Sequence, residues 1–402
     1  MNSIASFETN IPRFLITRAA YNAMFFLPIW VIFVQNKHGL DLVQVTLLDS
    51  AFWLTMALTE IPTGAVADTL GRKASYAIGI GLSIIGNLAF GLADSYALLI
   101  IANSLWAIAV TFISGADLAF LYDSLRELKR EHEYPRYRAI VTVIDVVSMG
   151  LAGLLGSFLF ARLPEAPFLL YSTVLAICLL IILTFREPPR ETDPETGLGL
   201  GYRQILGTAL RTIRSRPQLR FLLVYSSFLP VAVSVIEITL IQPHVVNIGL
   251  PVTALGVVLL GLRSAHVAGS VGSVRLAERL GDRRLFRTAP LFIAAGVIGL
   301  GLLPNLGGLF VFGLAGFSVA VARPVVEARM LAETPGSVRA TILSVDSLIL
   351  RLFVATVSPL CGLVAEAFSL SIAFIMLGVV AAGILIGLIF LRESQVPKTA
   401  IR

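Results

Sequence analysis

Residues 60–72, Glu-Ile-Pro-Thr-Gly-Ala-Val-Ala-Asp-Thr-Leu-Gly-Arg, are followed directly by Lys73. This stretch ends one long apolar segment, makes a polar turn, and leads into the next apolar segment at Ser75. A helix needs about 20 apolar residues to cross the hydrocarbon core of a bilayer. A charged turn between two segments of that length is too short to be a domain linker. We therefore expect it to pack against neighbouring helices on one face of a membrane.

The composition of the whole chain is that of a membrane protein. Of its 402 residues, 56% are hydrophobic and 14% are charged, whereas a soluble domain averages about 25% charged residues. The first apolar segment is not followed by a small-residue cleavage site, so we expect a retained first span. Cys178 and Cys361 lie within apolar runs and lack disulfide or metal-ligand spacing, which predicts a packing role.

Apolar segments of membrane-spanning length follow one another along the chain, and they predict an all-α membrane protein with twelve transmembrane helices. The predicted spans are residues 14–35, 42–66, 75–93, 96–120, 139–162, 167–185, 220–243, 252–274, 288–304, 307–328, 340–365 and 370–391. One long hydrophilic stretch separates the sixth span from the seventh. Its second part alternates apolar and basic residues at helical intervals, which predicts an amphipathic helix on the membrane surface.

Basic residues are concentrated in alternate loops. Arg72 and Lys73 follow the second span, the long central linker contains seven arginines, and further basic residues follow the fourth and eighth spans. The opposite loops contain only Lys37 and Arg162. Because cytoplasmic loops carry an excess of Lys and Arg, this asymmetry predicts that both termini lie in the cytoplasm.

The two halves of the sequence resemble each other. Residues 67–72, Ala-Asp-Thr-Leu-Gly-Arg, have a counterpart in residues 277–282, Ala-Glu-Arg-Leu-Gly-Asp. An Arg-Ala pair begins the fifth and the eleventh span, and seven residues after each arginine comes an aspartate, Asp145 or Asp346. This order predicts two pseudo-symmetric six-helix bundles, residues 1–188 and 220–402, joined by a cytoplasmic linker at 189–219.

The motif Gly-x-x-x-Asp-x-x-Gly-Arg-Lys at residues 64–73 resembles the signature loop of the major facilitator superfamily. The resemblance covers the whole chain, with twelve spans, a long central loop and a degenerate second copy of the motif. Residues 60–64 and 114–125 also resemble a bacterial subgroup of drug or metabolite exporters. The Gly-Pro element and the span-four arginine of proton-driven drug antiporters are not recognisable here.

The resemblance implies that the signature turn acts as a gate that holds the cytoplasmic side closed. Asp68 would accept hydrogen bonds from free amides at the start of the eleventh span, where the helix dipole favours an anion. Arg72 would pair with Asp123, as the family's charge relay implies. A purely structural capping turn is the alternative. The predicted gating residues of both halves are Gly64, Asp68, Gly71, Arg72, Lys73, Asp123, Glu278, Gly281 and Arg283.

Charged residues within a membrane span are costly, so they usually face protein or water and are candidates for function. Arg263 and Arg351 fall near mid-membrane, which suggests a central cavity with one charged wall. The alternative is that Glu237 and one arginine form a structural pair. Arg18 lies near the cytoplasmic end, where we expect it to extend to the surface. The substrate and proton candidates are Tyr21, Asn22, Asp49, Trp106, Asp145, Glu237, Arg263, Asp346 and Arg351.

The sequence has no phosphate-binding Gly-Lys-Ser/Thr loop and no His or Cys cluster with metal spacing, so we expect no enzyme, metal or cofactor. The membrane topology excludes nucleic-acid binding. The resemblance implies a monomeric secondary transporter of the bacterial inner membrane that exports a small amphipathic or anionic molecule, with protons as the coupling ion. Uptake of an organic acid by proton symport and a non-transporting receptor or scaffold are the alternatives.

Overall fold

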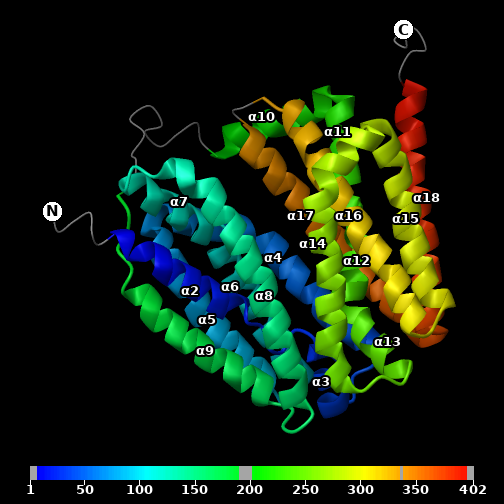
Figure 1. Ribbon diagram of the computed structural model, residues 1–402, viewed down its shortest axis with the longest axis horizontal. Helices are drawn as coiled ribbons and strands as arrows, with labels where there is room; N and C mark the ends of the chain where they lie inside the picture. The colour runs from blue at the N-terminus through cyan, green and yellow to red at the C-terminus, as the bar shows by residue number, and fades with distance from the viewer. Residues whose placement is uncertain (1–6, 190–201, 336–337, 396–402) are drawn as a thin grey trace. The chain divides into compact units, whose positions relative to one another are not determined.

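A computed structural model describes residues 7–189, 202–335 and 338–395 of the chain (Figure 1). Within these residues every regular element is a helix. Eleven helical segments are long and apolar enough to cross a membrane, and they coincide with the second to twelfth predicted spans. The prediction of an all-helical, multi-pass membrane protein is therefore confirmed.

The first predicted span, residues 14–35, is wrong as a single helix. It consists of α2 (Asn10–Asn22) and α3 (Trp30–His38), and residues 23–29 between them form successive tight turns. Proline has no backbone N–H to donate and its ring clashes with the preceding turn of a helix. Pro28 lies within these turns, and it disfavours a helix that continues across residues 23–29.

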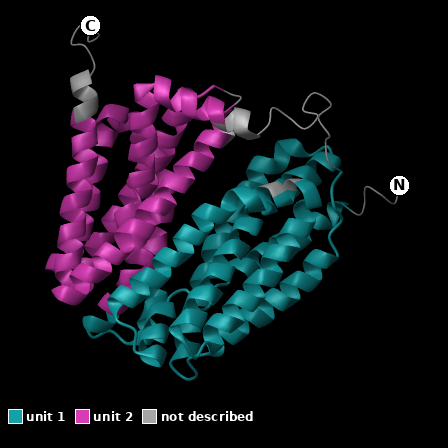
Figure 2. Cartoon of the chain, turned by 180° about the vertical axis from the view of Figure 1, so that it is seen from behind, with its two compact units in different colours: residues 1–191, 245–260 teal, residues 192–244, 261–402 magenta. Residues whose placement is uncertain are grey.

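The chain forms two compact units, coloured separately in Figure 2. Unit 1 comprises residues 1–191 and 245–260. In it α5 packs against α6 and α9, α4 packs against α6, and α2 packs against α8 and α9. Its further helices are α4 (Leu42–Leu70), α5 (Arg72–Leu92), α6 (Tyr96–Ser114), α7 (Asp117–Glu127), the short 3-10 helix η1 (Glu131–Glu133), α8 (Tyr134–Phe160) and α9 (Ala166–Leu183).

Unit 2 comprises residues 192–244 and 261–402, so α14 crosses the boundary between the units. Here α15 packs against α16 and α18, and α11 packs against α16 and α17. The elements that follow α9 are α10 (Tyr202–Ser215), α11 (Pro217–Phe228), α12 (Val231–Val235), the π-helix η3 (Ile236–Leu240), α13 (Ile241–Asn247), η4 (Val252–Ala254), α14 (Leu255–Leu280), α15 (Asp282–Leu302), α16 (Leu306–Ala332), α17 (Arg339–Ala367) and α18 (Leu370–Gln395).

The two units repeat the same packing scheme: α5, α6 and α9 in unit 1 correspond to α15, α16 and α18 in unit 2. The amphipathic helix predicted in the central linker is present as α10. The part of the predicted linker at residues 190–201 lies outside the described residues. The predicted domain division at residues 188 and 219 stays a prediction.

The turn between the second and third spans is shorter than expected. The helix α4 includes Pro62 and continues to Leu70, so only Gly71 separates it from α5. Gly71 has φ 107°, and Gly281, at the same place between α14 and α15, has φ 72°. Side chains with a Cβ rarely adopt these values, which explains a glycine at both positions.

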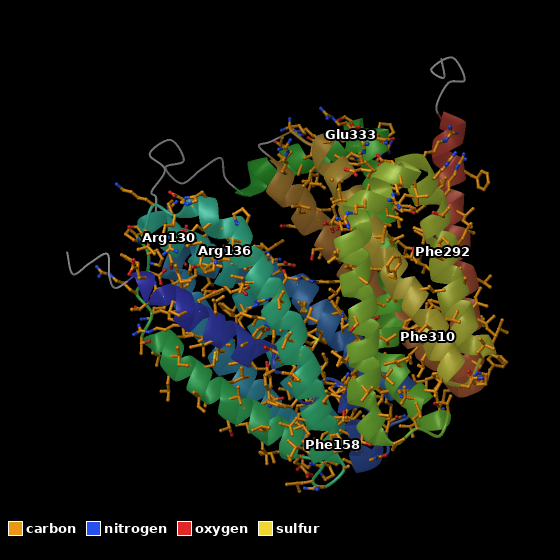
Figure 3. The ribbon with its side chains drawn as sticks, viewed as in Figure 1. Arg130, Arg136, Phe158, Phe292, Phe310 and Glu333 are labelled. Atoms are coloured by element: carbon orange, nitrogen blue, oxygen red, sulfur yellow. The ribbon has the colours of Figure 1, made fainter. Side chains whose placement is uncertain are left out.

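The sides and the ends of the units differ in polarity, as Figure 3 shows. Phe310 is 88% exposed, and Phe158 and Phe292 are also exposed on the flanks of their helices. Arg130 and Arg136 lie at the opposite end of unit 1 from Phe158. Apolar flanks with charged ends are expected of helices that cross a lipid bilayer.

Candidate functional site

Three charged side chains from three helices meet inside unit 1, and we call Arg18, Asp117 and Asp145 the Arg18 triad. The Nε and Nη2 atoms of Arg18 on α2 each donate a hydrogen bond of 2.7 Å to the Asp145 carboxylate on α8. The Nη1 atom of Arg18 binds the buried Asp117 carboxylate at the start of α7. The amide of Asn22, one turn beyond Arg18, donates to Asp145 at 2.9 Å.

The triad corrects the expectation that Arg18 extends to the membrane surface. Arg18 lies one turn before the end of α2, and that helix packs against α8. Its guanidinium therefore points into the unit, where two carboxylates compensate its charge. Tyr21, another predicted site residue, is buried beside the triad, and its backbone carbonyl accepts a hydrogen bond of 2.7 Å from the Tyr171 hydroxyl.

A second triad lies inside unit 2 and consists of Arg323, Glu327 and Asp346, which we call the Arg323 triad. Arg323 Nε donates to Glu327 Oε1 one turn along α16 at 2.7 Å. Its Nη2 lies 3.7 Å from Oδ2 of Asp346 on α17. The buried Asp346 also accepts a hydrogen bond of 2.8 Å from the Ser227 hydroxyl on α11.

The carboxylates of the two triads occupy corresponding positions. Asp117 follows Ser95, the N-cap residue of α6, by a certain number of residues. Glu327 follows Asn305, the N-cap residue of α16, by the same number. Asp145 and Asp346 are the repeat-related aspartates that the sequence predicts to share a role. Each has its partners inside its own unit.

The arginine differs between the triads, because Arg18 comes from the first helix of unit 1 and Arg323 from α16. Sequence reasoning missed Arg323, Glu327 and Asp117. The matching positions of Asp117 and Glu327 are a signal that could have found two of them.

A third charged group, which we call the Glu237 cluster, joins Glu237, Arg263 and His266 in unit 2. Glu237 lies in the π-helix η3 and is 5% exposed. Its Oε2 is 3.6 Å from Arg263 Nη1, and its Oε1 is 3.4 Å from His266 Nδ1, both on α14. On α16, Gly316 lies directly against His266 and Glu237. Two of the predicted candidates, Glu237 and Arg263, are therefore together.

The remaining mid-membrane candidates are placed separately. Asp49 is buried and accepts a hydrogen bond of 3.1 Å from Trp53 Nε1 on its own helix. Trp106 packs its ring against Phe26 and Phe52, at centroid distances of 5.1 and 4.9 Å. These contacts belong to the packing of unit 1.

Arg351, the other candidate in unit 2, is buried on α17. Asn87, an uncharged polar residue at mid-depth, donates to the Phe168 carbonyl and the Ser172 hydroxyl at 2.7 Å each, which is a structural role.

The signature turn has a partner that the sequence did not reveal. Both carboxylate oxygens of Glu187, just beyond α9, accept hydrogen bonds from the backbone amides of Arg72 and Lys73 at 2.7 and 2.8 Å. An anion at a helix N-terminus satisfies free amides and is favoured by the helix dipole. Glu187 therefore caps α5 and connects the turn to the end of α9.

The predicted contacts of the gate are described only in part. Asp123 lies 3.5 Å from Arg126 on its own helix. The side chain of Asp68 lies outside the described residues, so its predicted role stays a prediction. A Cβ at Gly64 would meet no described atom within 4 Å, and the predicted gating role of Gly64 stays a prediction as well.

The second copy of the turn reverses the charge at one position. Asp282 stands where the first copy has Arg72, and it forms an ion pair with Arg329 on α16. The predicted members Glu278 and Arg283 are exposed beside it. An ion pair thus connects the turn after α14 to the end of α16, although Asp282 and Arg329 are not the residues that the sequence predicted.

The two triads and the Glu237 cluster are better suited to binding a proton or another ion than to covalent chemistry. Each triad combines two carboxylates with one guanidinium, so one negative charge remains that a proton could neutralise. The Glu237 cluster is neutral when His266 is neutral. Groups of this kind in a membrane-spanning helix bundle typically take part in ion or substrate movement.

Comparison with known families gives an extended match. The family model of the Major Facilitator Superfamily matches residues 14–322. Among curated proteins, the uncharacterized MFS-type transporter YxaM of Bacillus subtilis (strain 168) is 22% identical over 360 residues, which cover 88% of each chain.

Solved transporter structures share the fold at low sequence identity. The D-xylose-proton symporter has a TM-score of 0.73 and 14% identity, and the match covers 95% of this chain and 97% of that one. A bacterial homologue of the human lysosomal transporter Spinster, inward-facing and occupied, has a TM-score of 0.73 and 14% identity over 97% of both chains. A mutant of the nucleoside transporter NupG has a TM-score of 0.72 and 14% identity, with 95% of this chain and 99% of that one covered.

Proposed function

Because the chain belongs to the major facilitator superfamily, we propose that this transporter uses the proton gradient to export a small amphipathic or anionic molecule by alternating access. The Arg18 triad is the observation that carries the proposal. Arg18 compensates one of its two carboxylates, Asp117 and Asp145, and a proton can neutralise the other. A group that gains and loses one proton inside a membrane span is what proton coupling requires.

The proposal includes the topology predicted from the sequence. In it, α2 and α3 together make the first crossing, which gives twelve crossings with both termini in the cytoplasm. The basic loops support this orientation, because positive residues are retained on the cytoplasmic side. The protein would act as a monomer in the bacterial inner membrane, with residues 1–188 and 220–402 as the six-helix halves. Cysteine-accessibility labelling of the loops at Lys37 and Arg130 in intact cells would test the orientation.

A second candidate function is proton symport of an organic acid. The Glu237 cluster favours it, since a negative substrate that binds Arg263 must be accompanied by a positive charge. One solved structure with this fold is that of a D-xylose-proton symporter. A non-transporting receptor or scaffold is the third candidate.

Flux measurements on reconstituted protein separate these candidates. Compounds that stabilise the purified protein in a thermal-shift screen would be radiolabelled and offered to right-side-out proteoliposomes with an imposed pH gradient. Faster entry with an acidic lumen supports exchange against protons, and faster entry with an alkaline lumen supports symport. If no stabilising compound crosses the membrane under either gradient, the transport proposal is wrong and the scaffold is favoured.

The Asp145→Asn variant tests the role of the Arg18 triad in coupling. We expect it to retain flux down a substrate gradient while losing the response to the pH gradient. Asp94→Asn is the matched control, because Asp94 is exposed in the loop between α5 and α6. A pH response that survives in Asp145→Asn would remove the triad from the mechanism.

The Asp68→Asn variant tests the proposed gate. A gate predicts normal protein abundance with lost transport, because the substitution would remove a contact that holds the cytoplasmic side closed. A purely structural capping turn predicts instead that the protein is lost. Western blotting of the membrane fraction alongside the flux assay distinguishes the two outcomes.

A further inference from the structure

We propose that Arg263 in the Glu237 cluster binds the carboxylate of an organic acid, and that Glu237 releases the guanidinium as a proton is taken up. This inference rests on the second candidate function above, proton symport of an organic acid. It assigns the residue that binds the acid and the residue that takes up the proton. Three features of the cluster carry it.

The first feature is the incomplete pairing of Arg263. Its Nη1 is 3.6 Å from Glu237, which is too long for a hydrogen bond, and its buried Nε has no hydrogen-bond partner in the described part of the chain. The side chain is nevertheless 32% exposed, so an incoming group can reach it. A guanidinium presents its N–H groups in a planar fork that matches the two oxygens of a carboxylate. Arg263 therefore has donors to spare for an anion.

The second feature is that Glu237 has an alternative partner. It belongs to the π-helix at Ile236–Leu240, and such turns frequently occur at functional sites. The side chain is almost completely buried, and its Oε1 has no hydrogen bond among the described residues. That oxygen lies 3.4 Å from His266 Nδ1. If Arg263 binds a substrate, Glu237 can either take up a proton or pair with a protonated His266, and both routes consume one proton.

Among the described residues, the elements around Glu237 supply no further charged group that could take the place of this proton. The charged groups that face Glu237 are Arg263 and His266, both from α14, while α16 contributes Gly316. The preceding helix α12 packs against α15, α17 and α18. On α17, Asp346 belongs to the Arg323 triad and Arg351 is buried. A carboxylate that enters the cluster therefore needs one proton to keep the buried charge balanced.

The third feature is the space kept free by Gly316. A Cβ at this position would lie 2.6 Å from Cε1 of His266 and 3.4 Å from Oε1 of Glu237. An alanine would therefore push His266 away from its place without removing any charge. This gives a variant that perturbs the partner of Glu237 while Arg263 and Glu237 stay intact.

Binding of benzoate, with uncharged benzamide as the matched probe, tests the site by titration calorimetry on the detergent-purified protein. We expect wild-type protein to prefer benzoate, and Arg263→Gln to weaken benzoate binding about tenfold to a hundredfold. Arg263→Lys should fall between them. Arg279→Gln is the control, because Arg279 is exposed near the end of the same helix. Titrations in buffers of different ionisation enthalpy should show on the order of one proton taken up per benzoate. Gly316→Ala should keep that number, because Glu237 can still take up the proton when His266 is displaced.

The result that overturns the proposal is benzoate binding that equals benzamide binding in the wild type, or that is unchanged in Arg263→Gln. Flux measurements distinguish a failure of the anion site from a failure of the proposed transport function. If both wild type and Arg263→Gln show proton-driven flux at equal rates, the anion site is wrong and the transport function stands. If Arg263 binds benzoate but no pH gradient drives any flux, the site stands and proton coupling fails.

Discussion

The Arg18 guanidinium on α2 binds the Asp145 carboxylate on α8 through two hydrogen bonds, Nε to Oδ1 and Nη2 to Oδ2, each 2.7 Å long. Its third contact is to Asp117 on α7. One side chain thus joins α2 to two helices whose aspartates follow Arg18 by 99 and 127 residues. Bidentate pairing of this kind fixes geometry as well as charge, so stability and coupling should both depend on it.

Arg18→Gln leaves two neighbouring carboxylates without their cation, and we expect it to reduce the free energy of unfolding by about 3 kcal/mol. Asp145→Asn should cost less, because Asp117 still compensates the arginine. The double variant Arg18→Gln/Asp145→Asn should cost less than the sum of the single ones, since the two residues interact directly. Thermal unfolding in detergent measures all three.

Arg136→Gln is the control for this series, because Arg136 is exposed at the start of α8 (Figure 3). It should unfold at the wild-type temperature. Strict additivity of the two single substitutions would show that the Arg18–Asp145 contact contributes nothing to folding.

Glu187→Gln should lower the free energy of unfolding by about 1 kcal/mol, because an uncharged amide interacts less well with the α5 N-terminus. Glu333 provides a contrast, since it is exposed at the other end of a helix, the C-terminus of α16. There a negative charge opposes the dipole, so Glu333→Gln should have no effect or a small stabilising one. Equal unfolding temperatures for Glu187→Gln and wild type would exclude the capping role.

Apolar run length was enough to predict most of the fold. Eleven of the twelve predicted spans coincide with helices, because the need to satisfy backbone groups in lipid leaves few alternatives to a helix. The span at 14–35 fails because hydropathy averages over Pro28, whereas a helix ends where its hydrogen bonds end. By contrast, α4 continues through Pro62, and the polar turn predicted after it consists of Gly71 alone.

The pairing of charges was harder to predict than the helices. The sequence could single out Arg263 and Glu237 as charged residues within spans, and the structure brings them together. It could not show that Arg18 faces inward, because depth along a helix does not reveal which side of the helix packs against protein. Glu187 lies just beyond the sixth predicted span, and its role as a cap depends on a contact across more than a hundred residues.

The pair of Lys37 and Glu165 predicts a pH-dependent contribution to stability. The Lys37 Nζ lies 3.1 Å from Glu165 Oε1, and this interaction lowers the pKa of Glu165 below its ordinary value of 4.5. A carboxyl group whose pKa is lower in the folded protein stabilises the fold at pH values above its pKa in the unfolded chain. This contribution disappears as the pH falls through the lowered pKa of the folded state.

Glu165→Gln should therefore unfold slightly more easily than wild type at neutral pH, by at most about 0.5 kcal/mol because solvent screens the pair. The difference should disappear as the pH falls through the lowered pKa of Glu165. Unfolding temperatures of both proteins across this pH range provide the measurement, and a difference that persists or grows in acid would contradict the assignment.

Two glycines on α8 allow a matched test of how closely that helix packs. A Cβ at Gly156 would overlap the backbone carbonyl of Phe25, in the turns between α2 and α3. A Cβ at Gly150 would instead meet the end of the flexible Leu260 side chain, 2.5 Å from its Cδ1. Since backbone cannot rotate away as a side chain can, Gly156→Ala should destabilise the protein by about 3 kcal/mol or abolish its accumulation.

Gly150→Ala should be nearly neutral, because the gain in helix propensity of about 1 kcal/mol offsets the shift of Leu260. Membrane-fraction abundance and the detergent unfolding temperature of both variants give the comparison. If the two alanines behave alike, close contact between α8 and the turns at Phe25 does not constrain the fold. If only Gly156→Ala fails, the interrupted first span is itself required for the packing of unit 1, because a continuous helix would carry no exposed carbonyl at Phe25 to meet this glycine.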